Sequence, residues 1–180
     1  CYWQNNSKSI ALSVWNVTPK NVMGYEKAVE WNGLIGAFGF IVTFSVAFYL
    51  AKLAKKHGAK MIHFVCLLLG AVSFLCFPIV QNQYVFFAVI IGYGIAWASM
   101  MGIPYLMVVA VVPKERYGVY MGIINMMIVI PMIIQNLSFG YILKNFLDND
   151  PRQAISFAGV LLLISSFCTL LIKSKKVSRE

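Results

Sequence analysis

The sequence predicts an all-α membrane protein with five transmembrane helices. Hydrophobic residues make up 60% of the 180 residues and charged residues only 12%, about half of the charged share of soluble domains. The charges are also unevenly placed, because residues 31–51, 61–113, 117–143 and 153–172 contain no Asp, Glu, Lys or Arg. A soluble domain of this size could not cover its surface with so few charged residues. The composition therefore excludes soluble globular, disordered and disulfide-scaffold proteins.

The uncharged stretches set the number of helices. A helix needs about 20 apolar residues to cross a bilayer, so residues 61–113 hold two helices, divided by Pro78 and the polar turn Gln81-Asn82-Gln83. Helices are favoured over barrel strands because the apolar residues run on without alternating. The expected bundle covers residues 31–173, with helices at about 31–52, 61–80, 84–112, 117–143 and 154–173.

Lys and Arg residues are unequally divided between the two ends of these helices. Of the 15, ten lie in the loops 52–60 and 113–117 or from Lys173 onward, and the other five lie at the opposite end. The positive-inside rule places the first group in the cytoplasm. We therefore expect residues 1–30 to be an extracytoplasmic loop and residues 174–180 a cytoplasmic basic tail. The net charge of +9 is then a topology signal. The partner that it implies is the lipid bilayer and not nucleic acid.

The amino end favours a longer protein. The first 30 residues are polar, begin with Cys and contain no apolar signal segment, so they would have to cross a membrane unaided. The odd number of helices points the same way. We expect the chain to be the C-terminal part of a larger protein, with at least one further span upstream.

No pattern for catalysis or for a bound cofactor stands out. Cys66, Cys76 and Cys168 lie in apolar helices, where a free Cys behaves as a small hydrophobic residue. His57 and His63 flank a basic loop with no Cys or carboxylate at ligand spacing. We find no Ser/His/Asp group and no phosphate cradle, so we expect neither an enzyme, a metal site nor a cofactor.

Polar and aromatic residues share faces of the third and fourth helices. At 100° per residue, Tyr93 and Trp97 lie on one face of the third helix, and Asn125 and Asn136 lie about 20° apart on the fourth, with Gln135 to one side. Amides buried in lipid are costly unless they face protein or water. Aromatic rings suit the C–H faces of sugars, and amides suit hydroxyl groups. These five residues are the predicted substrate-binding residues.

A packing role is the alternative for such faces. Small residues let helices approach closely, and Asn often joins neighbouring helices. We favour packing for the shared face of the first helix, which carries Asn32, Gly36, Gly39 and Thr43. The second and fifth helices have few interior polar residues, so we expect them to be lipid-facing supports around the other three.

Two stretches resemble a known family. Gly94-Ile-Ala-Trp-Ala-Ser-Met-Met-Gly-Ile-Pro-Tyr105 and Gly118-Val-Tyr-Met-Gly-Ile-Ile-Asn-Met-Met-Ile-Val-Ile-Pro131 are similar to two helices of sucrose-type sugar transporters of the major facilitator superfamily, and stand at the family's spacing. The stretch Leu53-Ala-Lys-Lys-His-Gly-Ala-Lys-Met-Ile-His63 is similar to its basic loop. The resemblance covers about residues 24–172 and implies helices 8–12 of a twelve-helix carrier.

The resemblance implies a function. Such a carrier moves a sugar, a disaccharide or related glycoside, together with protons by alternating access. Its other half is the missing N-terminal part of the same chain, and it lies in the plasma membrane, here a bacterial inner membrane, with its C-terminus in the cytoplasm. The alternatives are a non-transporting membrane scaffold or sensor, and a facilitator for a different small solute.

This chain departs from the family's pattern at two places, and its spans lack the carboxylate that proton coupling in such symporters typically uses. Met132 stands where the family usually has glutamine, which removes an amide from the expected inner face. The segment Lys56-His57-Gly58-Ala59 lacks the arginine commonly found there. No carboxylate lies within the predicted spans, since Glu26 and Glu30 sit at the outer edge. A coupling carboxylate would therefore belong to another part of the carrier.

Overall fold

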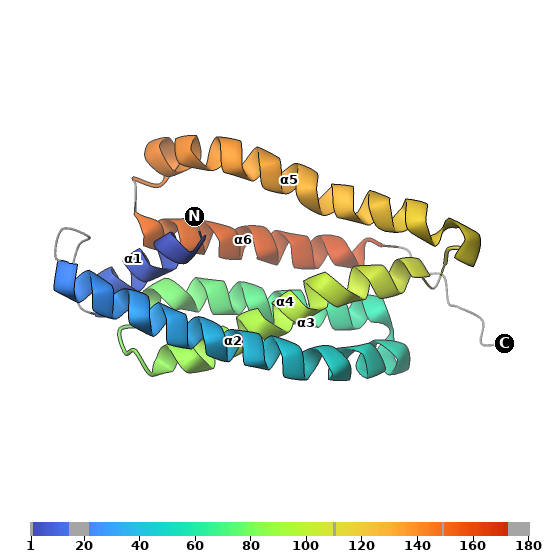
Figure 1. The fold of residues 1–180 in the computed structure, drawn as a ribbon, viewed down its shortest axis with the longest axis horizontal. Coiled ribbons are helices and arrows are strands. Elements are labelled where there is room, and N and C mark those ends of the chain that lie inside the picture. The colour runs from blue at the N-terminus through green and yellow to red at the C-terminus, as the bar shows by residue number, and fades with distance from the viewer. Residues whose placement is uncertain (1, 15–21, 110, 149, 173–180) are drawn as a thin grey trace.

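The computed structural model is a bundle of five long helices with a shorter helix packed at one end (Figure 1). It describes residues 2–14, 22–109, 111–148 and 150–172, so the expected tail 174–180 lies outside the described residues. In chain order the helices are α1 (Tyr2–Val14), α2 (Val22–His57), α3 (Ala59–Cys76), the 3-10 turn η1 (Phe77–Ile79), α4 (Val85–Val109), the 3-10 turn η2 (Lys114–Arg116), α5 (Tyr117–Phe146) and α6 (Pro151–Leu170).

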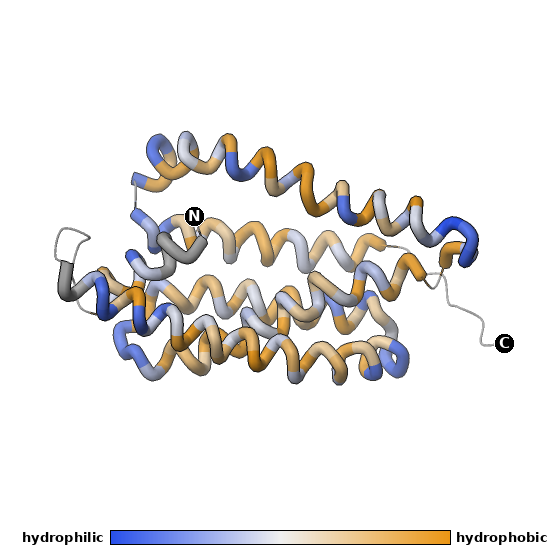
Figure 2. The backbone as a smooth tube through the Cα atoms, in the orientation of Figure 1, coloured by the Kyte–Doolittle hydropathy of each residue, from blue (hydrophilic) through white to orange (hydrophobic). Residues whose placement is uncertain are grey.

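The predicted number of spans is confirmed. Among the described residues, five helical segments are long and apolar enough to cross a membrane: Tyr25–His57, Ala59–Ile79, Val85–Val109, Lys114–Phe146 and Pro151–Leu170. Hydrophobic residues follow the middle of the helices, whereas hydrophilic residues collect near their ends (Figure 2). This is the distribution that a bilayer imposes on a helical bundle.

The first span begins earlier than predicted. We expected residues 31–52, but α2 runs from Val22 to His57. The prediction measured the uncharged stretch, which marks the hydrocarbon-crossing part and not the whole helix. Charged residues such as Glu26 and Lys27 have good helix propensity, so they extend a helix beyond the apolar layer.

The described part of residues 1–30, which we expected to be an extracytoplasmic loop, is largely helical. Besides the start of α2, Tyr2–Val14 forms α1. Ile10 and Ala11 of α1 are fully buried and join the main core, and the Asn32 amide donates a hydrogen bond to Ser7 Oγ at 2.9 Å. Tertiary packing therefore stabilises a helix in a segment that its polarity had marked as a loop. Residues 15–21 lie outside the description, and the side of the membrane stays a prediction.

The break between α3 and α4 lies where Pro78 and the polar turn predicted it. Pro78 sits in η1 directly after α3. Asn82 then starts α4, because its side-chain oxygen accepts a hydrogen bond from the Tyr84 amide at 2.9 Å and its carbonyl accepts one from the Val85 amide at 3.1 Å. Both bonds satisfy backbone donors that a helix start would otherwise leave unpaired.

Small residues allow α4 to lie close to both α2 and α3. A Cβ atom added at Gly94 would lie 2.9 Å from the Gly39 carbonyl oxygen, so the α2 and α4 backbones nearly touch. At the same crossing Thr43 Oγ1 donates to the Gly94 carbonyl at 3.1 Å. On the other side, Gly70 of α3 faces Ala96. These contacts confirm the packing interpretation for Gly39 and Thr43.

The second span is more covered in this structure than its few polar residues led us to expect, and the fourth span is less covered. The second span, α3, is the most covered and packs against α2, α4 and α6. The fourth span, α5, runs along one edge of the bundle (Figure 1), and Ile124 is its buried residue. Small residues let helices pack closely in lipid, and α3 carries Gly70, Ala71 and Ser73 on its buried face. Which of these helices faces lipid stays a prediction.

Candidate functional site

Two aromatic rings stack on α4. Tyr93 and Trp97 are one helical turn apart, and their rings lie with centroids 5.9 Å apart at an interplanar angle of 28°. Phe74 of α3 meets the Tyr93 ring edge-on, with centroids 5.4 Å apart. Both α4 side chains are half-buried. The pair therefore forms a rigid apolar surface whose Tyr93 end is fixed by α3.

The position of this stack follows from how α4 is held. Gly94 points to α2 and Ala96 to α3. At 100° per residue, Trp97 lies between these two directions, about 60° from Gly94 and about 100° from Ala96. Trp97 thus points between the directions of α2 and α3.

Asn125 lies on α5 and is bonded to α4. The Tyr105 hydroxyl donates a hydrogen bond to Asn125 Oδ1 at 2.5 Å. A second bond follows nearer the turn, where the Tyr117 hydroxyl donates to the Val109 carbonyl at 3.3 Å. Both bonds join the two helices of one hairpin on either side of η2. The Asn125 side chain is oriented by Tyr105, while its NH₂ group keeps two donors beyond this bond.

The other two predicted residues lie farther along α5. Gln135 and Asn136 are exposed, and no described hydrogen bond joins either of them to Trp97. The structure thus pairs Tyr93 with Trp97 and Asn125 with Tyr105. It does not gather all five predicted residues into one described pocket, and their role in binding stays a prediction.

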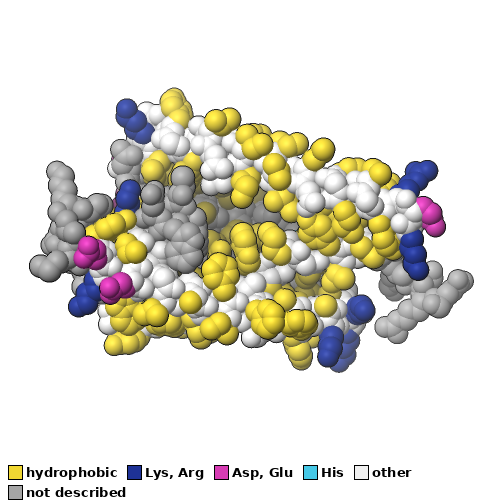
Figure 3. Space-filling view, in the orientation of Figure 1, with side chains coloured by type: hydrophobic (Ala, Val, Ile, Leu, Met, Phe, Trp, Pro, Cys, Tyr) yellow, Lys and Arg dark blue, Asp and Glu magenta, His cyan; other side chains and the backbone are white. Residues whose placement is uncertain are grey.

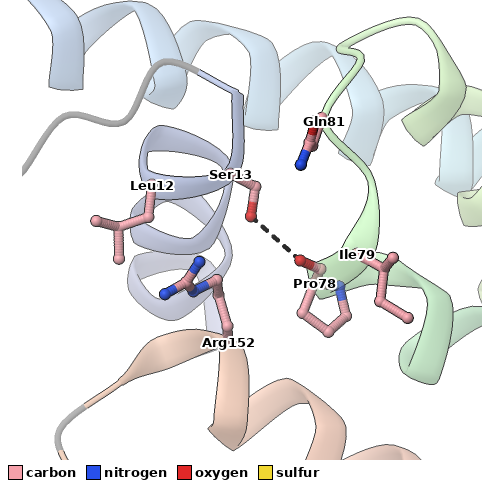
Figure 4. A pocket seen from close by; sticks show the side chains of 6 residues that line it. All are labelled: Leu12, Ser13, Pro78, Ile79, Gln81 and Arg152. Atoms are coloured by element: carbon pink, nitrogen blue, oxygen red, sulfur yellow. Dashed lines mark hydrogen bonds between the residues drawn. The ribbon is translucent and has the colours of Figure 1, made fainter.

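A pocket of about 390 Å³ lies at the end of the bundle beside α1. Figure 4 shows its lining, which is Leu12, Ser13, Pro78, Ile79, Gln81 and Arg152. The Ser13 hydroxyl donates to the Pro78 carbonyl at 3.5 Å, and the Arg152 guanidinium pairs with Asp150 at 3.1 Å. Its polar groups are thus partly occupied by internal contacts, and it shares no residue with the predicted site.

Charged side chains lie at the ends of the bundle. On the face shown in Figure 3, Lys, Arg, Asp and Glu gather at the two ends, and hydrophobic side chains cover the middle. Asp150 caps α6 and accepts a hydrogen bond from the Arg152 amide at 2.8 Å. The helix that carries Tyr93 and Trp97 has no charged side chain along its length.

Two side-chain contacts between helices were not predicted from the sequence. Tyr105 holds Asn125, and His63 Nδ1 lies 2.7 Å from the Ser99 hydroxyl oxygen, which joins α3 to α4. The sequence does carry a signal for the first. In a helical hairpin, residues equally far from the turn face each other, and Tyr105 and Asn125 lie at equal distances from Glu115 in η2. No comparable signal marks His63, because the neighbour of a helix face is set by the fold.

The comparison with known proteins identifies the family. The family model described as Major Facilitator Superfamily matches residues 10–180. No curated protein and no solved structure matches the chain. Proteins of this superfamily are transporters and not enzymes, and the five apolar helices are those of a multi-pass membrane protein. Because the match covers nearly the whole sequence, the chain belongs to the major facilitator superfamily of membrane transporters.

Proposed function

We propose that this transporter carries a sugar, a disaccharide or related glycoside, across the plasma membrane by alternating access. Family membership accounts for transport of some substrate. The choice of a sugar rests on the aromatic stack of α4 and the amides of α5, and on the resemblance of residues 94–105 and 118–131 to sucrose-type carriers. The bundle works with the rest of the carrier, which supplies the second wall of the cavity.

The observation that carries the proposal is the stack of Tyr93 on Trp97. The rings lie 5.9 Å apart on the half-buried side of α4, far from both ends of a 25-residue helix. A Trp at this depth does not serve as an interfacial anchor. The partly exposed Trp97 ring suits the C–H face of a pyranose ring, and the contact of Phe74 with Tyr93 supports the other end of the stack.

The amides of α5 supply the polar part of the proposed site. Tyr105 orients Asn125 through its side-chain oxygen, so the NH₂ group donates to a sugar hydroxyl. Gln135 and Asn136 lie exposed on the same helix and add donors and acceptors. Since α5 makes fewer contacts than the other spans, a movement of α5 toward α4 would bring these amides to the platform with little loss of packing.

Coupling to protons is the second part of the proposal. The described carboxylates are Glu26, Glu30, Glu115, Asp148 and Asp150, and each lies near a helix end or in a turn. None is placed to carry a proton at the level of Trp97. The proposal therefore requires a coupling carboxylate outside residues 1–180.

Uptake by the complete carrier in proteoliposomes tests the proposal. We expect accumulation of a labelled glycoside, competition by related glycosides, and loss of accumulation when a protonophore removes the proton gradient. Glycoside entry that ignores the gradient would contradict coupling and indicate a facilitator. Transport confined to non-sugar solutes would contradict the sugar assignment, and a failure to move any solute would favour the scaffold or sensor.

A further inference from the structure

One exposed face of α2 combines aromatic rings with lysines. At 100° per residue, Phe44, Phe48, Lys52 and Lys55 fall within about 80° of each other. The opposite side of the helix is packed, since Leu50 and Ala54 are each only 6% exposed. We call the first four residues, with Tyr49 and Lys56 beside them, the α2 end face.

The aromatic half of the α2 end face is open. Phe44, Phe48 and Tyr49 are 69%, 66% and 65% exposed. Phe44 and Phe48 contact each other edge to face, with centroids 5.3 Å apart. Tyr is enriched at the membrane interface, and the two Phe rings beside it give this part of the helix an uncovered apolar surface that suits contact with lipid.

The basic half carries charge that no described carboxylate balances. Lys52, Lys55 and Lys56 are exposed. The described ion pair, Arg152–Asp150, lies at the opposite end of the bundle, and Glu115 is the acidic residue described at this end. The helix turns back at once through Gly58, whose φ is 92°. This turn keeps Lys60, at the start of α3, close to the same group of charges.

Helix length places the two halves at different depths. The 36 residues of α2 extend over about 54 Å, whereas the hydrocarbon core of a bilayer is about 30 Å thick. The end of α2 therefore projects into the headgroup layer. From Phe44 to Lys52 the helix rises about 12 Å. The rings thus lie at the level of acyl chains when the lysines lie at the level of lipid phosphates.

We propose that the α2 end face binds an anionic phospholipid, with its phosphate on Lys52 and Lys55 and its acyl chains against Phe44 and Phe48. The apolar part continues directly into the transmembrane surface, which favours a lipid over a soluble anion or an acidic protein. Lysines near a membrane surface attract anionic lipids individually. Here the helical repeat also places Lys52 and Lys55 on the same face as Phe44 and Phe48. One lipid molecule can therefore contact both lysines and both rings at this position on the protein.

Native mass spectrometry of the complete carrier tests this inference. The protein in neutral detergent is titrated with phosphatidylglycerol or with phosphatidylcholine of the same acyl chains, and bound lipid is counted. The wild type is expected to bind phosphatidylglycerol more tightly. Lys52→Gln with Lys55→Gln should lower that affinity about five-fold per lysine. The double variant Phe44→Ala with Phe48→Ala, which keeps the charges, should weaken binding of both lipids.

A matched control separates a site from general attraction. Lys27 and Lys144 are exposed at the other end of the bundle, so Lys27→Gln with Lys144→Gln removes the same charge and should leave phosphatidylglycerol binding unchanged. Equal losses in both lysine double variants would overturn the proposal, as would equal affinities of the wild type for the two lipids. The latter result would mean that the remainder of the carrier covers this face of α2. Inorganic phosphate at the same concentrations should not compete, and competition would assign the lysines to a soluble anion.

Discussion

The Tyr105 hydroxyl and Asn125 Oδ1 lie 2.5 Å apart and form the side-chain to side-chain hydrogen bond described between α4 and α5. The bond fixes the amide that the sequence marked as a substrate ligand. It also anchors the helix that has the fewest packing contacts among the spans. Tyr105 is therefore a positioning residue for Asn125 in the proposed site.

Removing either partner should weaken substrate binding. One hydrogen bond contributes about 0.5–1.5 kcal/mol, or about 2- to 12-fold in affinity. We expect Tyr105→Phe to raise KM within this range and Asn125→Ala to raise it further, because Asn125 also contacts the sugar. Uptake by the double variant should match Asn125→Ala alone. Additive losses would show that the two side chains act independently. Surface expression is measured for each variant.

The aromatic platform predicts a dependence on ring shape. Trp97→Leu should reduce affinity for every transported sugar, because a branched aliphatic chain lacks the flat face that stacks on a sugar ring. Trp97→Tyr keeps a flat ring and should retain most of the affinity. The measurement is competitive uptake with the expression level matched. If Trp97→Leu inserts normally and keeps the affinity of the wild type, Trp97 is a packing residue.

The close crossing of α2 and α4 predicts a contrast between two glycines of α4. The added methyl group in Gly94→Ala would meet the Gly39 carbonyl oxygen at 2.9 Å, whereas Gly102→Ala meets nothing within 4 Å. Gly94→Ala should therefore destabilise the protein by about 1–3 kcal/mol. Gly102→Ala should be neutral or slightly stabilising. Thermal unfolding of the purified carrier compares the two, and equal effects would contradict the packing described.

Met132 offers a test of substrate preference. It is 56% exposed on α5 and lies one turn before Gln135 and Asn136, so Met132→Gln restores an amide next to two others. Competition between sugars should then change. Met127 is 71% exposed and points about 140° away from Met132, so Met127→Gln is the control and should leave the preference unaltered. The same profile in both variants would place position 132 away from the substrate.

The orientation is tested with single cysteines. Cys1, Cys66, Cys76 and Cys168 are replaced first, because Cys76 and Cys168 are exposed. A cysteine at Lys55 should resist a membrane-impermeant thiol reagent in intact cells, and one at Lys144 should react, since the positive-inside rule puts them on opposite sides. Both substitutions remove one lysine, so the charge change is the same. The reverse labelling would invert the proposed topology.

The spans were predictable because the bilayer imposes a simple rule on sequence. Four charge-free stretches and one internal break predicted the five apolar helices that the structure contains. The start of α2 at Val22 was not predictable in this way, since charges limit where a helix is buried and not where it begins. The helix α1 was missed because Ile10 and Ala11 are buried through contacts with distant parts of the chain.

The candidate site was predictable only in part. Helical periodicity placed Tyr93 and Trp97 on one face, and the structure stacks them. Periodicity gives the direction of a side chain but not the neighbour that it meets, so the partner of Asn125 was missed. The same limit applies to α3, whose close packing was not predicted: its Gly70 and Ser73 lie against α4, where the Ser73 hydroxyl donates to the Val89 carbonyl.

The single-residue turn at Gly58 has a consequence for biogenesis. Because α2 ends at His57 and α3 starts at Ala59, a single residue connects the two spans, and we expect them to enter the bilayer together as a hairpin. The backbone conformation at φ 92° costs a residue with a side chain about 1–3 kcal/mol. We therefore expect a substitution at Gly58 to act during membrane insertion. It should lower the yield of correctly inserted protein more than the activity of the protein that has been inserted.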